Sequence, residues 1–175
     1  MMHILLDSCI FRQDPQRKSA AFQALSRLGA SGELTLHIPY FVKNELLTQR
    51  EKEYLEHLGG LKKHLAKLMN KPLSGEIKNI VTSQLEAVKP LQSIITSWLA
   101  DEFSAWSDSI HAKCHLIENH HGSKVGEAYF AGELPFRERK KRDDIPDAFI
   151  FQTVVDVSEI TRNHDGIIKV AEIIE

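Results

Sequence analysis

Short apolar runs alternate with amphipathic stretches at the start of the chain, and this alternation is the strongest constraint on the fold. Residues 4–6 form a continuous apolar run that stops at Asp7, as expected of a strand buried on both faces. Residues 34–38 alternate apolar and polar side chains and predict a second strand. Amphipathic segments at 18–32 and 40–58 predict a helix after each strand. Strand–helix–strand–helix is the pattern of a parallel sheet, so we predict an α/β fold.

The middle of the chain reads differently. Between residues 51 and 128 no strand pattern is visible, and leucines recur at helical spacing. Breaks are expected at Gly59–Gly60, Lys71–Pro72, Gly75 and Lys89–Pro90. We therefore predict a single domain over residues 1–175, with a core at about 1–50 and 129–175 and a helical insertion at about 51–128.

The last part of the chain returns to mixed patterns. Residues 122–136 predict a loop with some helical turn, and His120–His121 before Gly122 predict a turn. Residues 145–160 predict a strong helix. Residues 166–175 predict a last strand that runs into a short helix. Only three strand candidates are visible, which is few for such a sheet.

Composition narrows the class of protein. The chain has 175 residues, of which 42% are apolar and 26% charged, as in one globular domain with a real core. The formal net charge is −2, so a nucleic-acid surface has to be local. The two cysteines, Cys9 and Cys114, favour a reducing compartment rather than a disulfide framework. No apolar run has transmembrane length and the first residues lack a signal-peptide pattern, so we expect a cytoplasmic protein without membrane contact.

Three acids occur at the tops of different predicted core elements. Asp7 follows the first strand, where ligands bind in parallel α/β sheets, although a cap or Asx turn would explain it equally well. Glu45 lies at the edge of the apolar stripe of its helix, although it could simply reach water or pair with a neighbour. Asp147 precedes Ile150 and Val154 on the core-facing stripe of the last helix. Together these carboxylates predict a site for a hard cation, because they would otherwise repel one another.

Other charges surround the third acid. Asp144 lies three residues before Asp147, and the pair also imitates a capping box at a helix N-terminus. A basic run precedes both acids; its members are Arg137, Arg139, Lys140, Lys141 and Arg142. Such a run is often a solvated loop, but next to acids it predicts a surface that holds a nucleic-acid backbone.

Three segments resemble the acidic motifs of the PIN-domain nucleases: "HILLDSCIF", "IPYFVKNEL" and "DIPDAFIFQTV". The most specific match is "GEAYFAGELPFRERKKRDDIPDAFIF", which resembles a PIN-like branch with a helical insert and a PF…KK…(F/I)PDAF motif. The resemblance spans residues 3–155, with little to compare inside the insert. It implies a Rossmann-like three-layer α/β/α PIN-like fold with a parallel sheet and a Mg²⁺- or Mn²⁺-dependent nuclease site.

The resemblance also implies roles for individual residues. Asp7, Glu45 and Asp147 match the three catalytic, metal-binding acids, and Asp144 matches an accessory acidic position. Ser8 matches a small hydroxyl position after the first acid, where it would contact substrate phosphate with Arg139, Lys140, Lys141 and Arg142. A fourth acid usually follows a further strand in a Ser/Thr-x-Asp-type motif. In this chain Thr161, Asn163 and Asp165 are similar to that motif, but the expected apolar strand before it is missing. Asp165 is therefore a candidate for the fourth metal ligand.

The implied activity is an endonuclease, with RNA favoured over DNA, of a kind that often serves as a toxin or in phage defence. Possible partners are an antitoxin or defence-system protein and a second copy of the chain. The alternative is a catalytically degraded PIN-like module that binds RNA or a protein. A phosphatase-like hydrolase is disfavoured because Cys9 stands where a second acid would serve it. His111 and His115 have a zinc-ligand spacing but lack a further ligand pair.

Overall fold

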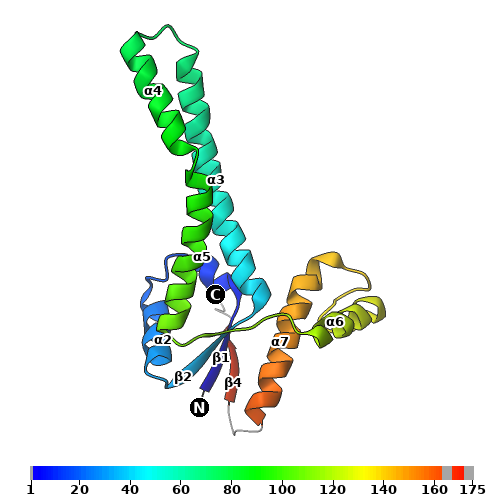
Figure 1. Ribbon diagram of the computed structural model, residues 1–175. Coiled ribbons are helices and arrows are strands. Elements are labelled where there is room, and N and C mark those ends of the chain that lie inside the picture. The colour runs from blue at the N-terminus through cyan, green and yellow to red at the C-terminus, as the bar shows by residue number, and fades with distance from the viewer. Residues whose placement is uncertain (1, 163–166, 172–175) are drawn as a thin grey trace. The chain divides into compact units, whose positions relative to one another are not determined.

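The computed structural model describes residues 2–162 and, for the backbone, strand residues 167–171. The chain divides into two compact units (Figure 1). Unit 1 comprises Met1–Leu46 and Trp106–Glu175, and unit 2 comprises Leu47–Ala105. Unit 1 contains every candidate site residue predicted above.

Unit 1 is built on a parallel four-stranded sheet in the order β3-β2-β1-β4. Its strands are β1 (Met2–Leu6), β2 (Leu34–Ile38), β3 (Lys113–Cys114) and β4 (Ile167–Ala171). In the register Ile4 lies opposite Leu36 on one side and Lys169 on the other. The α/β prediction is confirmed, as are the two N-terminal strands and the last one. The sequence analysis missed β3, because it is a two-residue exposed edge strand without an apolar run.

Unit 1 also contains five complete helical segments among the described residues. They are α1 (Ser8–Gln13), α2 (Ala20–Ala30), α6 (Asn119–Ala131), the 3-10 turn η1 (Arg142–Asp144) and α7 (Ile145–Arg162). Helices α2 and α7 confirm predictions, and Ser19 caps α2 by accepting from the N–H of Phe22. Helix α1 was not predicted because six residues are too few to show a period. The segment 122–136, expected as a loop with some helical turn, is helical as far as Ala131, and the turn expected at His120–His121 was wrong, since α6 includes both histidines.

Unit 2 is helical, as its leucine spacing predicts. Its residues come from α3 (Tyr40–Met69), α4 (Gly75–Val88) and α5 (Leu91–Ser109), of which α3 begins and α5 ends in unit 1. The break expected at Gly59–Gly60 was wrong, because α3 continues through both glycines. An Arg50–Glu102 ion pair of 2.9 Å joins α3 to α5 within the unit. None of the described helices has both the length and the apolar character that crossing a membrane requires.

The helical insertion at about 51–128 stays a prediction, and the structure divides its residues between the two units. Unit 2 ends at Ala105, and residues 106–128 belong to unit 1. The physical reason is that β3 follows α5 and pairs with β2, with His37 opposite Lys113 and Ile38 opposite Cys114. Whether units 1 and 2 form one PIN-like domain stays a prediction.

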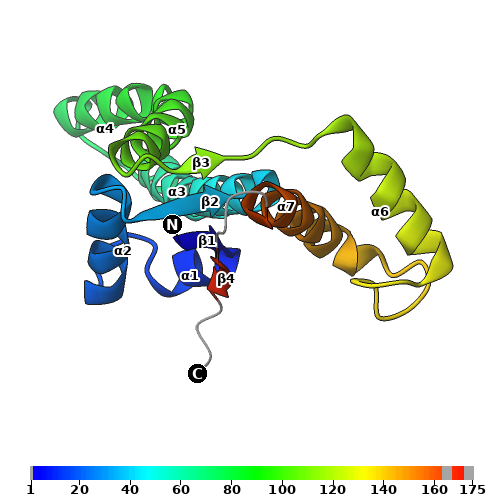
Figure 2. The ribbon, with the colours of Figure 1, turned by 90° about the horizontal axis from the view of Figure 1, so that it is seen from below.

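The sheet separates two layers of helix. Helices α2 and α7 lie on opposite sides of the strands (Figure 2), which fits the three-layer prediction. On the α2 side the rings of Phe11 and Phe22 pack with Trp106, at centroid distances of 5.8 and 5.9 Å. Phe11 and Phe22 are buried. This aromatic cluster packs α1 and α2 together. Because α1 begins two residues after β1 ends, the cluster also fixes the position of the β1 end.

The close packing of α2 generates a prediction about Gly29. A Cβ at this position would lie 2.9 Å from the backbone oxygen of Ile110, which cannot rotate away. Gly29→Ala is therefore expected to lower the free energy of unfolding by ~1–3 kcal/mol. The measurement is denaturant unfolding followed by circular dichroism.

Gly126 is the matched control, because it also lies inside a helix of unit 1 but a Cβ there meets nothing within 4 Å. Gly126→Ala is expected to raise stability by up to ~1 kcal/mol, since alanine is the better helix former. Equal effects at the two positions would contradict the packing described for Gly29.

Candidate metal and nucleic-acid site

Asp7 lies at the carboxyl end of β1 and is also the N-cap of α1. Its Oδ1 accepts a hydrogen bond of 2.7 Å from the N–H of Ser8. The capping role that the sequence left open is therefore real. It does not exclude ligand binding, because a carboxylate has about four acceptor positions and the cap uses one of them.

Glu45 lies on an exposed face of α3, within its unit 1 part. Its Oε1 forms an ion pair with Nη2 of Arg12, which comes from α1. The same Nη2 lies 3.3 Å from the hydroxyl of Ser8. Arg12 thus brings a positive charge between the first two acids. The sequence analysis missed Arg12 because its position depends on α1, which has no visible periodicity.

Asp147 lies in the first turn of α7. Two residues further on, Phe149 stacks on Phe41 with ring centroids 5.0 Å apart. Phe41 lies one turn before Glu45 on α3. This ring contact therefore holds the helices that carry the second and third acids next to each other.

The pKa of Asp147 shows that the acids act on one another. It is raised above its usual value, and partial burial is the largest cause. Repulsion from three other carboxylates adds to it: those of Asp7, Asp144 and Glu45. The positive charge of Arg137 opposes the rise. All four acids predicted for the site thus share one electrostatic environment.

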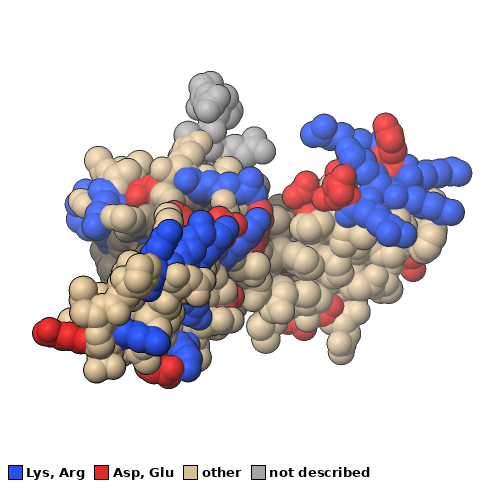
Figure 3. Space-filling model, turned by 90° about the horizontal axis from the view of Figure 1, so that it is seen from above, with Lys and Arg blue, Asp and Glu red and all other residues tan. Residues whose placement is uncertain are grey.

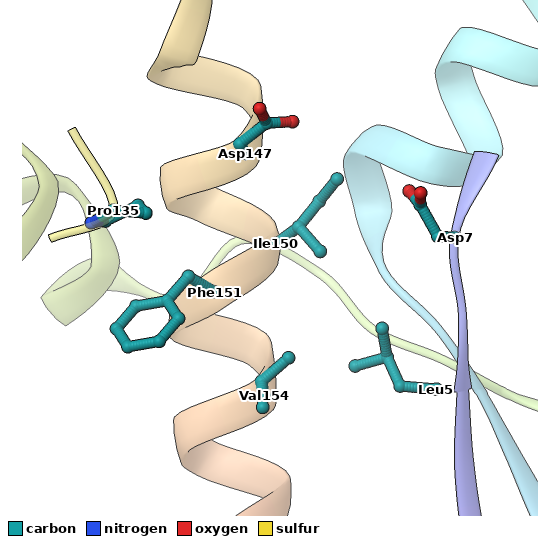
Figure 4. A pocket seen from close by; sticks show the side chains of 7 residues that line it. All are labelled: Leu5, Asp7, Pro135, Asp147, Ile150, Phe151 and Val154. Atoms are coloured by element: carbon teal, nitrogen blue, oxygen red, sulfur yellow. The ribbon is translucent and has the colours of Figure 1, made fainter. Parts of the chain in front are cut away.

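A cavity of about 420 Å³ opens beside two of these acids. Its lining residues are Leu5, Asp7, Pro135, Asp147, Ile150, Phe151 and Val154. Figure 4 shows the carboxylates of Asp7 and Asp147 turned toward each other, with Ile150 between the two backbones. The acids therefore lie at a hollow large enough for a ligand.

Asp144 connects the acids to the basic run. Its Oδ2 accepts from the N–H of Arg137 at 3.4 Å, and its Oδ1 lies 3.5 Å from Nζ of Lys141. These contacts orient Asp144 toward the loop that precedes η1. No hydrogen bond from the Asp144 side chain to the first turn of α7 is found among the described residues, so the capping-box alternative has no support there.

The basic run forms a charged surface over the α6–η1 connection. Figure 3 shows its lysines and arginines gathered at the end of unit 1 that carries α6. Within the described part of the chain, Lys141 is the one member with a carboxylate at salt-bridge distance. The other members are Arg137, Arg139, Lys140 and Arg142, and their charges are available to an anionic ligand.

The candidate fourth acid follows the end of α7 in the sequence. Asp165 and Asn163 lie outside the described residues. Thr161 is described: it is buried, and its hydroxyl bonds to the backbone oxygen of Val157 within α7. Thr161 therefore serves its own helix.

A second polar group lies elsewhere in unit 1. His120, His121 and Asp156 are the described side chains whose ligand atoms all lie within 4.8 Å of one another. His121 Nδ1 accepts from the N–H of Glu118 at 3.2 Å, so Nε2 carries the proton that meets Asp156 Oδ2 at 2.7 Å. Burial raises the pKa of Asp156, but the hydrogen bonds from His121 and His120 outweigh it and the net pKa is lowered. A metal bound to His121 Nε2 would leave the ring proton on Nδ1, which could then no longer accept from the N–H of Glu118 at the start of α6. We therefore describe this group as a hydrogen-bonded clasp between α6 and α7.

Three further histidines form a chain at the sheet. His37 Nε2 lies 2.9 Å from His3 Nδ1, and His37 Nδ1 lies 2.8 Å from His115 Nε2. His111 and His115 do not lie one turn apart on a helix, because β3 lies between them, so their spacing does not support a zinc site. Burial is the main reason that the pKa of His37 falls to about 3, followed by the charges of His115 and His3. His37 is therefore neutral at ordinary pH.

The four acids fit a hard divalent cation. Carboxylate oxygens are the ligands that Mg²⁺ and Mn²⁺ prefer, and no soft ligand is needed. The carboxylate oxygens of these four acids are more widely separated than the ligand atoms of His120, His121 and Asp156, which all lie within 4.8 Å of one another. Mg²⁺ tolerates such a spread, because it usually keeps several waters and binds one or two carboxylates directly.

A model of the PIN domain matches residues 4–172 of the chain. The chain belongs to the PIN-domain family. No curated protein and no solved structure matches it. The matched range includes both units and all four acids discussed above.

PIN domains are typically nucleases that act on nucleic acids and generally use divalent metal ions. Membership therefore supports the class of nuclease and the Rossmann-like fold predicted from the motifs. It does not assign the individual acids, the identity of the ion or the choice of RNA.

The repulsion at Asp147 generates a prediction about cation binding. With EDTA, Asp147→Asn is expected to leave stability equal or slightly higher, within about 0.5 kcal/mol, because a repelled charge is removed. With MnCl₂ at 100 times Kd, the unsubstituted chain is expected to gain roughly 5–10 °C in Tm, and Asp147→Asn to lose most of that gain. Differential scanning fluorimetry measures both.

Asp143→Asn is the matched control, since Asp143 is an exposed acid of η1 that does not act on Asp147. It is expected to keep the full response to Mn²⁺. An equal response in all three proteins would show that Mn²⁺ binds elsewhere.

The buried His37 generates a prediction about pH. Its pKa is about 3 in the folded chain and 6.5 when unperturbed, so the unfolded state binds more protons between these values. Stability is therefore full above pH 6.5 and falls as the pH drops from 6.5 toward 3, by up to ~1.4 kcal/mol per pH unit. The measurement is the free energy of unfolding at pH 7, 6 and 5. His37→Gln should show a shallower fall, and an unchanged fall would assign the effect to other groups.

Proposed function

We propose that the protein is a metal-dependent endoribonuclease. The observation that carries the proposal is the cavity that Asp7 and Asp147 line, with Asp144 in contact with the adjacent basic run. Asp7, Glu45 and Asp147 would bind Mg²⁺ or Mn²⁺ and Asp144 would assist, with Asp165 as a further candidate ligand. A bound cation of this kind lowers the pKa of water and stabilises negative charge on a phosphodiester.

The chain's own residues would orient the substrate. Arg137 lies close enough to Asp147 to lower its pKa, so a phosphate held by Arg137 would lie near the acids. Arg139, Lys140, Lys141 and Arg142 would hold the neighbouring phosphates, because cations that contact the backbone bind nucleic acid regardless of sequence.

Two residues near Asp7 have narrower roles. Ser8 is buried, and its hydroxyl accepts a hydrogen bond from Arg12. Ser8 would therefore act on substrate phosphate together with Arg12. Arg12 holds Glu45 in place and partly neutralises it. A cation bound at the acids would take over that neutralising role and release Arg12 toward the phosphate.

The preference for RNA, and a role as a toxin or in phage defence with an antitoxin or defence-system partner, rest on the resemblance of the motifs. The alternative is a PIN-like module that binds RNA or a protein without cutting it. Asp165 lies outside the described residues, so the choice between nuclease and binding module rests on the other acids.

The test is cleavage of end-labelled single-stranded RNA and DNA of the same sequence. The expected result is endonucleolytic cleavage of RNA with Mn²⁺ or Mg²⁺, none with EDTA, and a loss of at least ~100-fold in rate for Asp147→Asn, because one acid of the cation site is missing. Asp143→Asn is expected to keep the rate. Cleavage of DNA alone would contradict the proposed RNA substrate and identify a deoxyribonuclease. No cleavage by a folded protein that binds Mn²⁺ would favour the module that binds RNA or a protein without cutting it.

A further inference from the structure

An exposed aromatic ring lies against the basic run. Phe130 is 64% exposed near the C-terminal end of α6. The Nζ of Lys140 lies over this ring, 5.8 Å from its centroid. A single exposed phenylalanine needs no explanation, but a ring next to a set of available cations offers both stacking and charge.

The backbone holds this pair in place. The N–H of Lys140 donates to the carbonyl oxygen of Tyr129 at 3.0 Å, and the hydroxyl of Tyr129 donates to the carbonyl oxygen of Lys140 at 3.0 Å. Arg139 Nε donates to the carbonyl oxygen of Ala131 at 3.1 Å. These bonds keep Lys140 at φ 60, a conformation that non-glycine residues rarely adopt.

A glycine permits this close return of the loop. Gly132 ends α6 at φ 74, and a Cβ there would lie 2.6 Å from Cγ of Arg139. The basic loop therefore folds directly back over the end of α6. Its lysine and arginine side chains start from a fixed backbone rather than from a solvated, unstructured run.

The same helix connects the ring to the acids. Tyr129 packs on a small core of Val125, Phe136 and Ala148. Neighbouring helix residues point about 100° apart, so an inward Tyr129 leaves Phe130 outward. Ala148 follows Asp147 on α7, and therefore the ring and the acid site are parts of one packed assembly within unit 1.

We propose that Phe130 and Lys140 form a binding subsite for an unpaired nucleotide, in which the base stacks on the ring and Lys140 contacts the phosphate. The proposal rests on the proposed nuclease function and specifies its substrate as single-stranded. In a duplex the base faces are covered by their neighbours, so only a splayed-out base can stack on a protein ring. The positive charge of Lys140 beside the ring favours a nucleic acid over an uncharged partner.

The test measures binding rather than cleavage. Fluorescence anisotropy is recorded in EDTA with full-length protein carrying Asp147→Asn, using a labelled single-stranded RNA and an RNA duplex of equal length. Phe130→Leu keeps apolar bulk but removes the flat ring, and it is expected to weaken single-strand binding roughly tenfold, with duplex binding unchanged. Phe130→Trp is expected to keep the affinity and to show fluorescence quenching when RNA binds.

Leu134→Ala is the matched control, because Leu134 is a neighbouring apolar side chain that is 80% exposed. It is expected to bind both RNAs as the parent does. Unchanged single-strand binding by Phe130→Leu would overturn the subsite, and so would an equal loss for single strand and duplex. Either result is independent of cleavage, which is read separately with metal and the unsubstituted chain.

Discussion

The packing that brings β1, α3 and α7 together is the constraint on which the candidate site of unit 1 depends. Asp147 carries a raised pKa because it is partly buried and lies near Asp7, Asp144 and Glu45. Such an arrangement persists only if the framework holds it against its own charges. The framework here is a parallel sheet that ends at Asp7, the Phe41–Phe149 stack between α3 and α7, and the core shared by α6 and α7.

Two positive groups moderate the repulsion from different elements. Arg12 pairs with Glu45 from α1, and Arg137 acts on Asp147 from the loop before η1. Two other polar groups join elements of unit 1: the chain of His3, His37 and His115 at the sheet, and the clasp of His120 and His121 on Asp156 between α6 and α7.

The fold was predictable where the chain is regular. The runs at β1 and β2 have the period of buried strands, and α2, α3 and α7 have apolar stripes long enough to recognise. Elements of two to six residues, β3 and α1, escaped because a period needs several repeats to be visible. Helix α6 escaped because its glycines and histidines resemble a turn, although a capping arrangement of Glu118 and His121 starts it.

The sequence by itself determined the acids, their motif spacing and the basic run, because each is local and resembles the PIN-domain pattern. Only the tertiary structure decided that Asp7 also caps α1, that Arg12 meets Glu45, and that Lys140 is clasped to Tyr129 over the ring of Phe130. The physical reason is that these contacts join segments far apart in the chain or depend on a single unusual backbone conformation. Neither kind of information repeats along a sequence, so a pattern in one chain cannot carry it.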